Sequence, residues 1–421
     1  MDRFHIEGPC TLEGTVRVGG AKNAVLPLMA ATLLTEGVSR VRNVPRLRDS
    51  RTMVRVLETM GASVEFEGHE LTIDTSGARG IEAPYELVKT MRASIYVLGP
   101  TLARHGEAKV SLPGGCAWGP RPVNLHLMGM EALGAEIDLD AGYIHAKADR
   151  LRGAEINFEI SSVGATANVL MAAVLAEGRS VLDNAAREPE ITQLAQALAA
   201  AGAKIDGIGT TRLEVTGVEQ LRPLDVSVIP DRIEVGTFLA GAAMLRSKIR
   251  VEGVRPEHVA STVDALSMTG ARFTVHDDAI EADGTNAHRP INATTRPFPG
   301  FPTDMQAQTM AAACLMDGIS VITDTIYTDR FTHVAELQRL GAEIRVENNA
   351  AIVRGVESLR GAPVMATDLR ASAALILAGL AAEGTTVLDR IYHIDRGYEA
   401  IERKLGALGA RIERVPGPPT P

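Results

Sequence analysis

The sequence contains few aromatic residues and few cysteines. Aromatic side chains make up 4% of the 421 residues, and there is a single tryptophan, which disfavours ligand binding by stacking on many aromatic platforms. The three cysteines, Cys10, Cys116 and Cys314, are odd in number and form no CxxC pair. This pattern disfavours both a disulfide framework and a zinc site. We therefore expect no metal and no cofactor, and a reducing compartment.

Excess positive charge and long apolar runs are also absent. The sequence has 43 Lys and Arg residues and 52 Asp and Glu residues, which gives a formal net charge of −9. This charge disfavours a nucleic-acid binder, because such a protein needs a basic face. No apolar run reaches the ~20 residues of a membrane span, and the start, MDRFHIEGPC, lacks the pattern of a signal peptide. We expect a cytoplasmic protein with no nucleic-acid, membrane or obligate protein partner. Any anionic ligand then needs a local cluster of Lys and Arg.

A short phrase built on Gly-Ala occurs six times. Each copy closes an amphipathic pattern and then begins to alternate, which predicts a helix that ends at a C-cap glycine and leads into a strand. The spacings between successive glycines are 73, 68, 68, 71 and 68 residues. The six glycines are Gly61, Gly134, Gly202, Gly270, Gly341 and Gly409.

Each copy is accompanied by an Ala-rich segment that is apolar nearly all round, which predicts a buried helix. These segments lie at 19–37, 89–106, 161–178, 230–247, 303–318 and 367–384. A period near 70 residues is too long for a common helical solenoid. The predicted unit is a strand, a buried helix, a strand, an amphipathic helix and a strand pair.

Six such units in a chain of this length indicate two domains. We expect an α/β fold of two globes with three repeats each. Residues 22–229 form the first globe, and residues 1–21 with 230–421 form the second, because the leading strands in FHIEGPCTLEGTVRVGG (4–20) stand outside the first run of repeats. The two connections predict a two-stranded hinge.

Polar residues stand where the buried helices are predicted to begin. Helix N-termini favour anions, and Asp, Ser or Asn there can equally be ordinary N-caps; for Asp231 we prefer the N-cap. Lys and Arg at a helix start oppose the dipole and so indicate a ligand. Arg396, in a polar turn, fits a surface salt bridge as well as a binding site. The other residues at predicted helix starts are Lys22, Asn23, Arg92, Ser162, Arg232, Asp304, Asp368 and Arg370.

The segment SLPGGCAWGPRPVNLH (111–126) interrupts the repeat pattern. Its glycines and prolines predict an exposed loop, where functional residues are common. A thiol near cations is acidified and reactive, so Cys116 is a candidate nucleophile or acid. Cys314 lies in an apolar segment and is predicted to be an inert core residue, as is Cys10. His126, His333 and His393 lack metal spacing and are expected to form hydrogen bonds.

Several motifs together resemble one family. They are KNA (22–24), KTMRAS (89–94), LPGGC followed by RPV (112–123), SVGAT (162–166), FPTDMQAQ (301–308), ATDLRAS (366–372) and YHIDRGYE (392–399). In this order over essentially the whole chain, they resemble the UDP-N-acetylglucosamine 1-carboxyvinyltransferases, which are enolpyruvyl transferases of peptidoglycan synthesis. The resemblance implies two inside-out α/β barrel-like globes.

The implied reaction moves an enolpyruvyl group from phosphoenolpyruvate to the 3′-hydroxyl of UDP-N-acetylglucosamine and releases phosphate, through a tetrahedral intermediate. By this resemblance Cys116 is the proton donor, the target of the epoxide fosfomycin, and Asp304 is the base. Lys22 and Arg396 act in catalysis. Phosphoenolpyruvate is bound by Lys22, Asn23, Arg121, Arg370 and Arg396. The nucleotide sugar is bound by Asn23, Arg92, Arg121, Pro122, Val123, Asn124, Leu125, Ser162, Val163, Gly164, Asp304 and Ile326.

Two alternatives remain open from the sequence. The sister enzyme, 3-phosphoshikimate 1-carboxyvinyltransferase, shares the architecture, but Cys116 and YHIDRGYE favour the sugar-nucleotide enzyme. A non-catalytic paralogue that senses sugar nucleotide would not need Cys116 and Asp304 as an acid and base pair. Asn124 and Ile160 depart from the family pattern, in which Asp and Lys are common, both on the nucleotide side.

Overall fold

The computed structural model describes residues 2–112 and 123–417. The chain divides into two compact units. The N-unit is Gly20–Ile229, and the C-unit combines the residues up to Gly19 with those from Pro230 onward. The N-unit begins two residues before the expected boundary at residue 22. The Ala21 amide donates to the Ile229 carbonyl (2.7 Å), and this contact between the two ends of the N-unit places Ala21 inside it.

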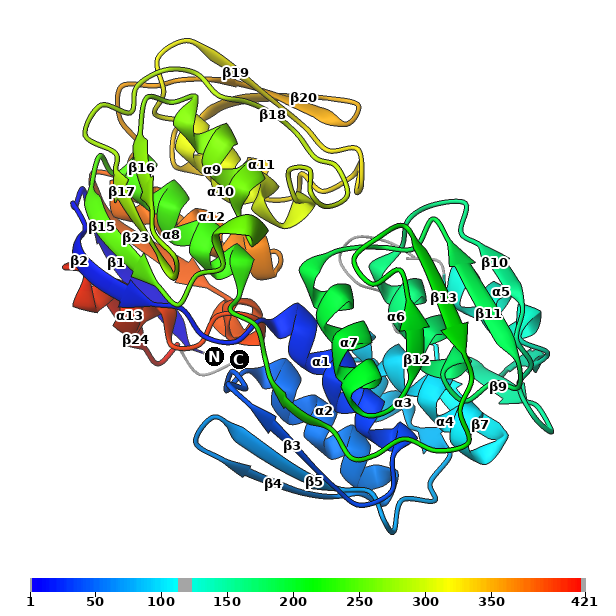
Figure 1. Ribbon diagram of the computed structural model, residues 1–421. Helices are drawn as coiled ribbons and strands as arrows, with labels where there is room; N and C mark the ends of the chain where they lie inside the picture. Colours follow the sequence, from blue (N-terminus) through cyan, green and yellow to red (C-terminus); the bar gives the residue numbers. More distant parts are fainter. Residues whose placement is uncertain (1, 113–122, 418–421) are drawn as a thin grey trace. The chain divides into compact units, whose positions relative to one another are not determined.

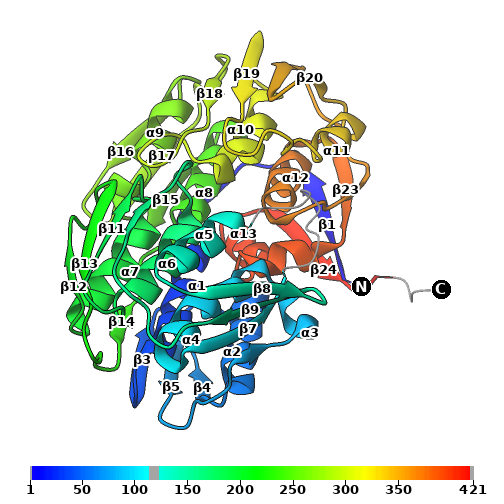
Figure 2. The same cartoon turned by 90° about the vertical axis from the view of Figure 1, so that its right-hand side faces the viewer.

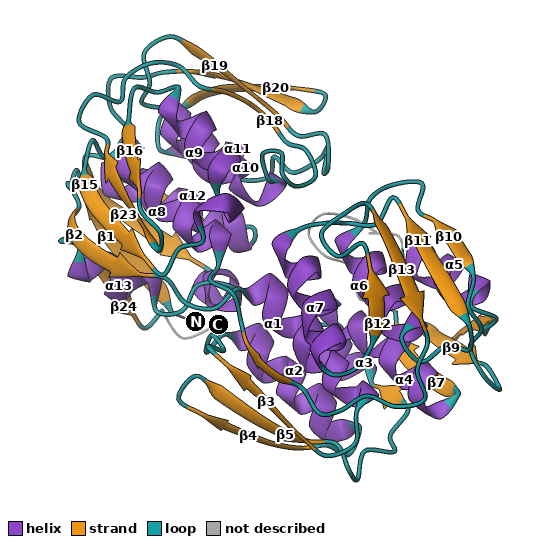
Figure 3. Cartoon of the chain, in the orientation of Figure 1, coloured by secondary structure: helices purple, strands orange, loops and turns teal. Residues whose placement is uncertain are grey.

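The N-unit has three four-stranded sheets with helices packed on their inner faces (Figures 1 and 3). In each sheet the first two strands of the order given below are parallel, and the first of them is short. The remaining neighbours are antiparallel. The sheet orders are β14-β3-β5-β4, β6-β7-β9-β8 and β10-β11-β13-β12. The strands are β3 (Val38–Arg42), β4 (Ser63–Glu67), β5 (Glu70–Asp74), β6 (Glu82–Ala83), β7 (Glu107–Ser111), β8 (Glu136–Asp140), β9 (Tyr143–Lys147), β10 (Glu155–Asn157), β11 (Arg179–Asp183), β12 (Lys204–Asp206), β13 (Arg212–Thr216) and β14 (Asp225–Ser227).

The helices of the N-unit are of the two kinds that the sequence predicts. Helices α1, α4 and α6 lie largely in the core, because their segments are apolar nearly all round. Helices α2, α5 and α7 precede the strands β4, β8 and β12. The bounds are α1 (Lys22–Ala31), η1 (Thr32–Leu34), α2 (Arg48–Thr59), α3 (Tyr85–Val88), η2 (Arg92–Val97), α4 (Leu98–His105), α5 (Asn124–Ala132), α6 (Val163–Ala173) and α7 (Pro189–Ala200).

The C-unit repeats the same plan. Its sheets are β22-β23-β1-β24, β16-β17-β15-β2 and β18-β19-β21-β20, and β1 and β2 come from the start of the chain. The strands are β1 (Arg3–Gly8), β2 (Glu13–Arg17), β15 (Lys248–Glu252), β16 (Arg272–Val275), β17 (Ala279–Asp283), β18 (Asn292–Thr294), β19 (Ile319–Thr323), β20 (Glu343–Glu347), β21 (Ala350–Arg354), β22 (Pro363–Met365), β23 (Gly384–Asp389) and β24 (Arg411–Val415).

The central helices of the C-unit, α8, α10 and α12, contact one another, and Figure 2 shows α10 and α12 side by side. Each unit has its own large aliphatic core. The bounds are α8 (Arg232–Met244), η3 (Pro256–His258), α9 (Ala260–Ser267), η4 (Thr303–Met305), α10 (Gln306–Ala313), α11 (Val334–Arg339), α12 (Leu369–Ala381), η5 (Ile391–Arg396) and α13 (Ile401–Ala407).

The predicted helix-ending glycines have the backbone that their position requires. Gly61, after α2, has φ +90°, and the other five repeat glycines have φ between +92° and +115°. Only glycine adopts this conformation at little cost. A strand begins two residues after each of them, so the predicted change from helix to strand is confirmed.

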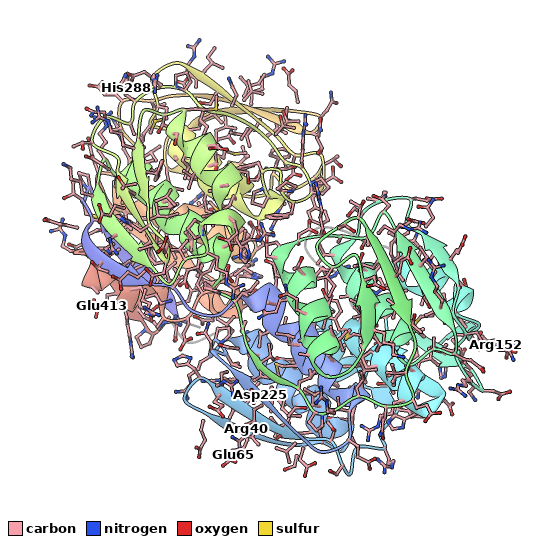
Figure 4. The ribbon with its side chains drawn as sticks, viewed as in Figure 1. Arg40, Glu65, Arg152, Asp225, His288 and Glu413 are labelled. Carbon is pink, nitrogen blue, oxygen red and sulfur yellow. The ribbon has the colours of Figure 1, made fainter. Side chains whose placement is uncertain are left out.

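The sheets turn charged side chains away from the helices. On one face of the sheet β14-β3-β5-β4, Asp225 of β14 is paired with Arg40 of β3. Glu65 of β4 lies in the same row of paired residues, two strands away from Arg40. Figure 4 shows these three side chains on the outside of the N-unit. Since successive side chains of a strand point to opposite faces, the alternate residues Val41 and Ile73 are buried.

Candidate active site

Asp304 in the C-unit is held by two arginines. It lies in η4, directly before α10. Arg330 Nη1 donates to its Oδ1 at 2.8 Å, and Arg370 Nη2 donates to its Oδ2 at 2.9 Å. Both arginine side chains are buried, whereas that of Asp304 is 24% exposed. The carboxylate is therefore fixed from two sides with one edge accessible.

The charges of this cluster set the protonation of Asp304. Burial alone would raise its pKa, but the nearby guanidinium groups of Arg370 and Arg330, together with their hydrogen bonds, hold the pKa well below 3.8. Burial alone would lower the pKa of each arginine, but the neighbouring acidic groups, Asp304 foremost, and the hydrogen bonds to Asp304 together raise it. Asp304 is consequently ionised, and a weak base, while both arginines hold it.

Arg370 is the second residue of α12, where a cation opposes the helix dipole. Asp368 caps the helix by accepting from the amides of Arg370 (2.7 Å) and Ala371 (3.3 Å). The guanidinium lies 5.4 Å from the ring centroid of Tyr398. Its buried Nε and Nη1 have no hydrogen-bond acceptor among the described residues. A buried guanidinium with donors to spare is suited to binding an anion.

Ile326 is connected to Asp304 through a buried carboxylate. Asp324, at the end of β19, accepts from the Ile326 amide (3.0 Å) and from the Thr303 hydroxyl (2.6 Å). The same hydroxyl accepts from Arg330 Nη1 (3.0 Å). This chain of hydrogen bonds fixes the loop that carries Ile326 beside the turn that carries Asp304.

Arg396 is the last residue of η5 and is half-buried. The preceding residue, Asp395, forms a bidentate ion pair with Arg414 of β24, at 2.6 and 3.1 Å. η5 packs against α12, the helix that carries Arg370. The turn is therefore anchored to the sheet on one side and to α12 on the other.

In the N-unit, Lys22 and Asn23 are the first two residues of α1. Lys22 Nζ lies 3.0 Å from Oδ2 of Asp49, which is buried on α2. α1 contacts η2, which begins at Arg92, and also contacts α6. Lys22, a cation at a helix start, thus has a carboxylate partner that the sequence did not reveal.

The start of α6 carries the SVG motif. Ser162 is the N-cap, and its hydroxyl accepts from the Ala165 amide at 3.3 Å. Val163 and Gly164 are the first two residues of the helix. Val123, Asn124 and Leu125 lie at the start of α5, which packs against α6. Ile160, shortly before the cap, is 69% exposed.

Three predicted site residues, Cys116, Arg121 and Pro122, lie outside the described residues. Of the other two cysteines, Cys314 is the core residue that was expected, whereas Cys10 is only partly buried, at the edge of the core. Cys314 is fully buried, which raises its pKa to about 12. The pKa of Cys10 is raised by partial burial, against the opposing effect of Arg411. Neither is an activated thiol.

Sequence reasoning missed Arg330, the second partner of Asp304. It follows a polar stretch between β19 and α11, and no repeat position or motif marks it. The N-cap role preferred for Asp231 is confirmed, because its carboxylate accepts from the amides of Ile233 (2.8 Å) and Glu234 (3.1 Å). In the part of the chain that the structure describes, no group of three potential ligands could hold a metal ion. No helix there is long and apolar enough to span a membrane.

Known enzymes resemble this chain over nearly its whole length. Residues 6–405 match the family EPSP synthase (3-phosphoshikimate 1-carboxyvinyltransferase). The chain is 54% identical over 99% of its length to the whole UDP-N-acetylglucosamine 1-carboxyvinyltransferase of Geobacter metallireducens. It is 55% identical, again over 99% of its length, to the whole enzyme of that name from Hydrogenovibrio crunogenus.

Solved structures show the same fold. The enolpyruvyl transferase NikO from Streptomyces tendae matches with a TM-score of 0.89 and 26% identity, over 99% of both chains. An EPSP synthase from Acinetobacter baumannii matches with a TM-score of 0.73 and 19% identity, over 99% of this chain and 100% of the other. The two-globe enolpyruvyl transferase fold expected from the sequence is thus confirmed. The chain belongs to the enolpyruvyl transferase family that includes EPSP synthase and, within that family, to the UDP-N-acetylglucosamine 1-carboxyvinyltransferases.

Proposed function

We propose that this chain transfers the enolpyruvyl group of phosphoenolpyruvate to the 3′-hydroxyl of UDP-N-acetylglucosamine and releases phosphate, as the first committed step of peptidoglycan synthesis. The observation that carries the proposal is the full-length identity of 54–55% to enzymes named for this reaction. The ion-paired Asp304 with its two arginines supplies chemistry that fits it. Cytoplasmic location is part of the proposal, since both substrates and a reduced thiol at Cys116 suit that compartment.

The reaction needs a base for the attacking hydroxyl, and we assign this role to Asp304. An ideal base has a pKa near the working pH, whereas the two arginines hold the pKa of Asp304 low. An anion that binds Arg370 through its spare donors neutralises part of the charge facing Asp304 and so raises its pKa. Binding of anionic substrate thereby prepares the base.

Carbon 3 of the enol must gain a proton while the hydroxyl attacks carbon 2, and we assign the donor to Cys116. In the collapse of the tetrahedral intermediate, the bond from carbon 2 to the phosphate oxygen breaks, carbon 3 loses a proton, and the double bond forms again as phosphate leaves. Lys22, Arg121, Arg370 and Arg396, with Asn23, are proposed to bind the phosphate and carboxylate of phosphoenolpyruvate. Fixed cations that face developing charge lower the barrier without reorganisation during the reaction.

The nucleotide sugar is proposed to bind through the start of α6 and its surroundings. Backbone amides at an N-terminus of this kind suit a diphosphate. The proposed contacts are Asn23, Arg92, Arg121, Pro122, Val123, Asn124, Leu125, Ser162, Val163, Gly164, Asp304 and Ile326.

Phosphate release from phosphoenolpyruvate, measured with each candidate acceptor, tests the proposal. We expect turnover with UDP-N-acetylglucosamine and none with shikimate 3-phosphate. Turnover with shikimate 3-phosphate alone would establish the sister activity. Binding of sugar nucleotide without phosphate release would indicate a non-catalytic sensor.

A further inference from the structure

Asn168 lies in the middle of α6, and both the oxygen and the nitrogen of its side-chain amide form hydrogen bonds inside the core of the N-unit. The residue is fully buried. Its Oδ1 accepts from the Gly99 amide at 2.7 Å. Its Nδ2 donates to the Ile95 carbonyl at 2.9 Å and lies 3.0 Å from Nδ1 of His126. The amide thereby connects α6 with η2, α4 and α5.

These partners fix the orientation of the amide. A backbone N–H can only donate, so the atom that faces Gly99 must be the oxygen. A backbone carbonyl can only accept, so the atom that faces Ile95 must be the nitrogen. The second hydrogen of Nδ2 then points to His126, whose Nδ1 must accept it. In a neutral imidazole the remaining hydrogen is consequently on Nε2.

Nε2 of His126 faces the start of α6. A Cβ atom on Gly164 would lie 3.2 Å from it, so the ring packs closely against this glycine. His126 is 8% exposed, and within residues 2–112 and 123–417 its Nε2 forms no hydrogen bond. A ring N–H that forms no hydrogen bond within the protein can donate to a ligand. Its position beside the amides of the SVG turn points to a ligand oxygen as the acceptor.

We propose that Asn168 is a positioning residue that fixes His126 as its Nε2–H tautomer, so that the ring presents one neutral N–H donor to an oxygen of the sugar nucleotide at the start of α6. The identity of the ligand rests on the proposed function. The tautomer rests on the hydrogen bonds of Asn168 alone.

The surroundings keep the ring neutral. Burial, assisted by the positive charge of Arg92, lowers the pKa of His126 to about 4. Among the described residues, Arg92 of η2 is the charged group that acts on the ring. His126 is therefore a fixed hydrogen-bond donor at neutral pH rather than a proton carrier.

Nitrogen NMR of histidine-labelled protein tests the tautomer without any ligand. The signals of His126 are assigned by their absence from His126→Gln. We expect a protonated, pyrrole-type Nε2 and an unprotonated, pyridine-type Nδ1 that stay unchanged from pH 8 to pH 6. A hydrogen on Nδ1, or a mixture of tautomers, would overturn the proposal.

A pair of variants tests the donor. His126→Gln keeps an N–H group near the position of Nε2. His126→Leu fills a similar volume but has no hydrogen-bond donor. We expect His126→Gln to bind UDP-N-acetylglucosamine about tenfold more tightly than His126→Leu, the size of one lost hydrogen bond. Equal affinity in the two variants, measured by calorimetry on folded protein, would show that the ring only packs.

Asn168→Asp tests the positioning role itself. A carboxylate can only accept, so it draws the hydrogen of the neutral ring to Nδ1 and leaves Nε2 without one. We expect about tenfold weaker binding at pH 8, and recovery relative to wild type as the pH falls, because the protonated ring regains an Nε2–H. A structural defect alone would give weaker binding at every pH. That outcome, in protein with a normal thermal transition, would overturn the proposal.

The experiments distinguish a wrong substrate from a wrong role for Asn168. If wild-type protein binds no UDP-N-acetylglucosamine, the proposed substrate is wrong, while the NMR measurement still decides the tautomer. If the nucleotide binds and the NMR places the hydrogen on Nδ1, the positioning role is wrong and the proposed substrate stands.

Discussion

Asp304 and Arg370 lie 66 residues apart in the sequence and form an ion pair of 2.9 Å between Oδ2 and Nη2. Arg330 Nη1 pairs with the other oxygen, Oδ1, of the same carboxylate at 2.8 Å. The pairing makes Asp304 both a structural anion and the proposed base. Its two roles can be separated, because the base acts only in turnover whereas the ion pairs act in the free protein.

Asp304→Asn is expected to reduce kcat by ~10²–10⁴-fold, since an amide cannot take the proton of the attacking hydroxyl. Binding of UDP-N-acetylglucosamine should be retained within a few-fold, because the amide oxygen still accepts a hydrogen bond. Stopped-flow phosphate release and calorimetry measure the two quantities. Near-normal turnover would move the role of base to another residue.

Arg330→Met is expected to destabilise the protein by about 2 kcal/mol, because Asp304 loses one of its two charged hydrogen-bond partners. The pKa of Asp304 should rise with one cation gone, so the acidic limb of the kcat profile should move to higher pH. Arg339→Met, at an exposed arginine of α11, is the matched control and should change neither quantity. An unmoved acidic limb would argue that Arg330 has no influence on the base.

His333 is expected to make the protein sensitive to acid. It is fully buried, and burial, assisted by Arg330, lowers its pKa to about 3, from an ordinary value of 6.5. The unfolded chain therefore binds a proton below pH 6.5 that the folded chain does not, and stability falls as the pH falls. From pH 6.5 to 5 the loss for this one residue is about 2 kcal/mol.

His333→Leu should remove that share of the pH dependence. Both ring nitrogens lack a hydrogen-bond partner among the described residues, so the variant should be at least as stable as wild type at pH 7. Urea unfolding at pH 7, 6 and 5 measures the difference. A variant that keeps the full slope would assign the acid sensitivity to other groups.

Fosfomycin treatment at pH 8 is expected to modify Cys116 and neither of the other cysteines. The thiolate is the reactive form, and the raised pKa values of Cys314 and Cys10 keep both as thiols. Peptide mass mapping locates the adduct, and Cys116→Ser serves as the unlabelled control. An adduct on Cys10 would contradict the assignment of the reactive thiol.

The sequence by itself determined the repeat. Apolar periodicity and a glycine C-cap are local properties, so six helices ending at glycine, each followed by a strand, were readable without knowledge of the packing. The cap formed by Asp231 was also predictable, because its partners Ile233 and Glu234 are two and three residues away.

Only the tertiary structure decided which distant groups meet. Arg330 occupies no repeat position, yet packing brings it to Asp304, and Asn168 reaches His126 across α5 and α6. The unit boundary at Gly20, in place of residue 22, likewise depends on the bond from Ala21 to Ile229. Partners of this kind are chosen by the directions in which side chains leave separately packed elements, and no spacing along the chain encodes those directions.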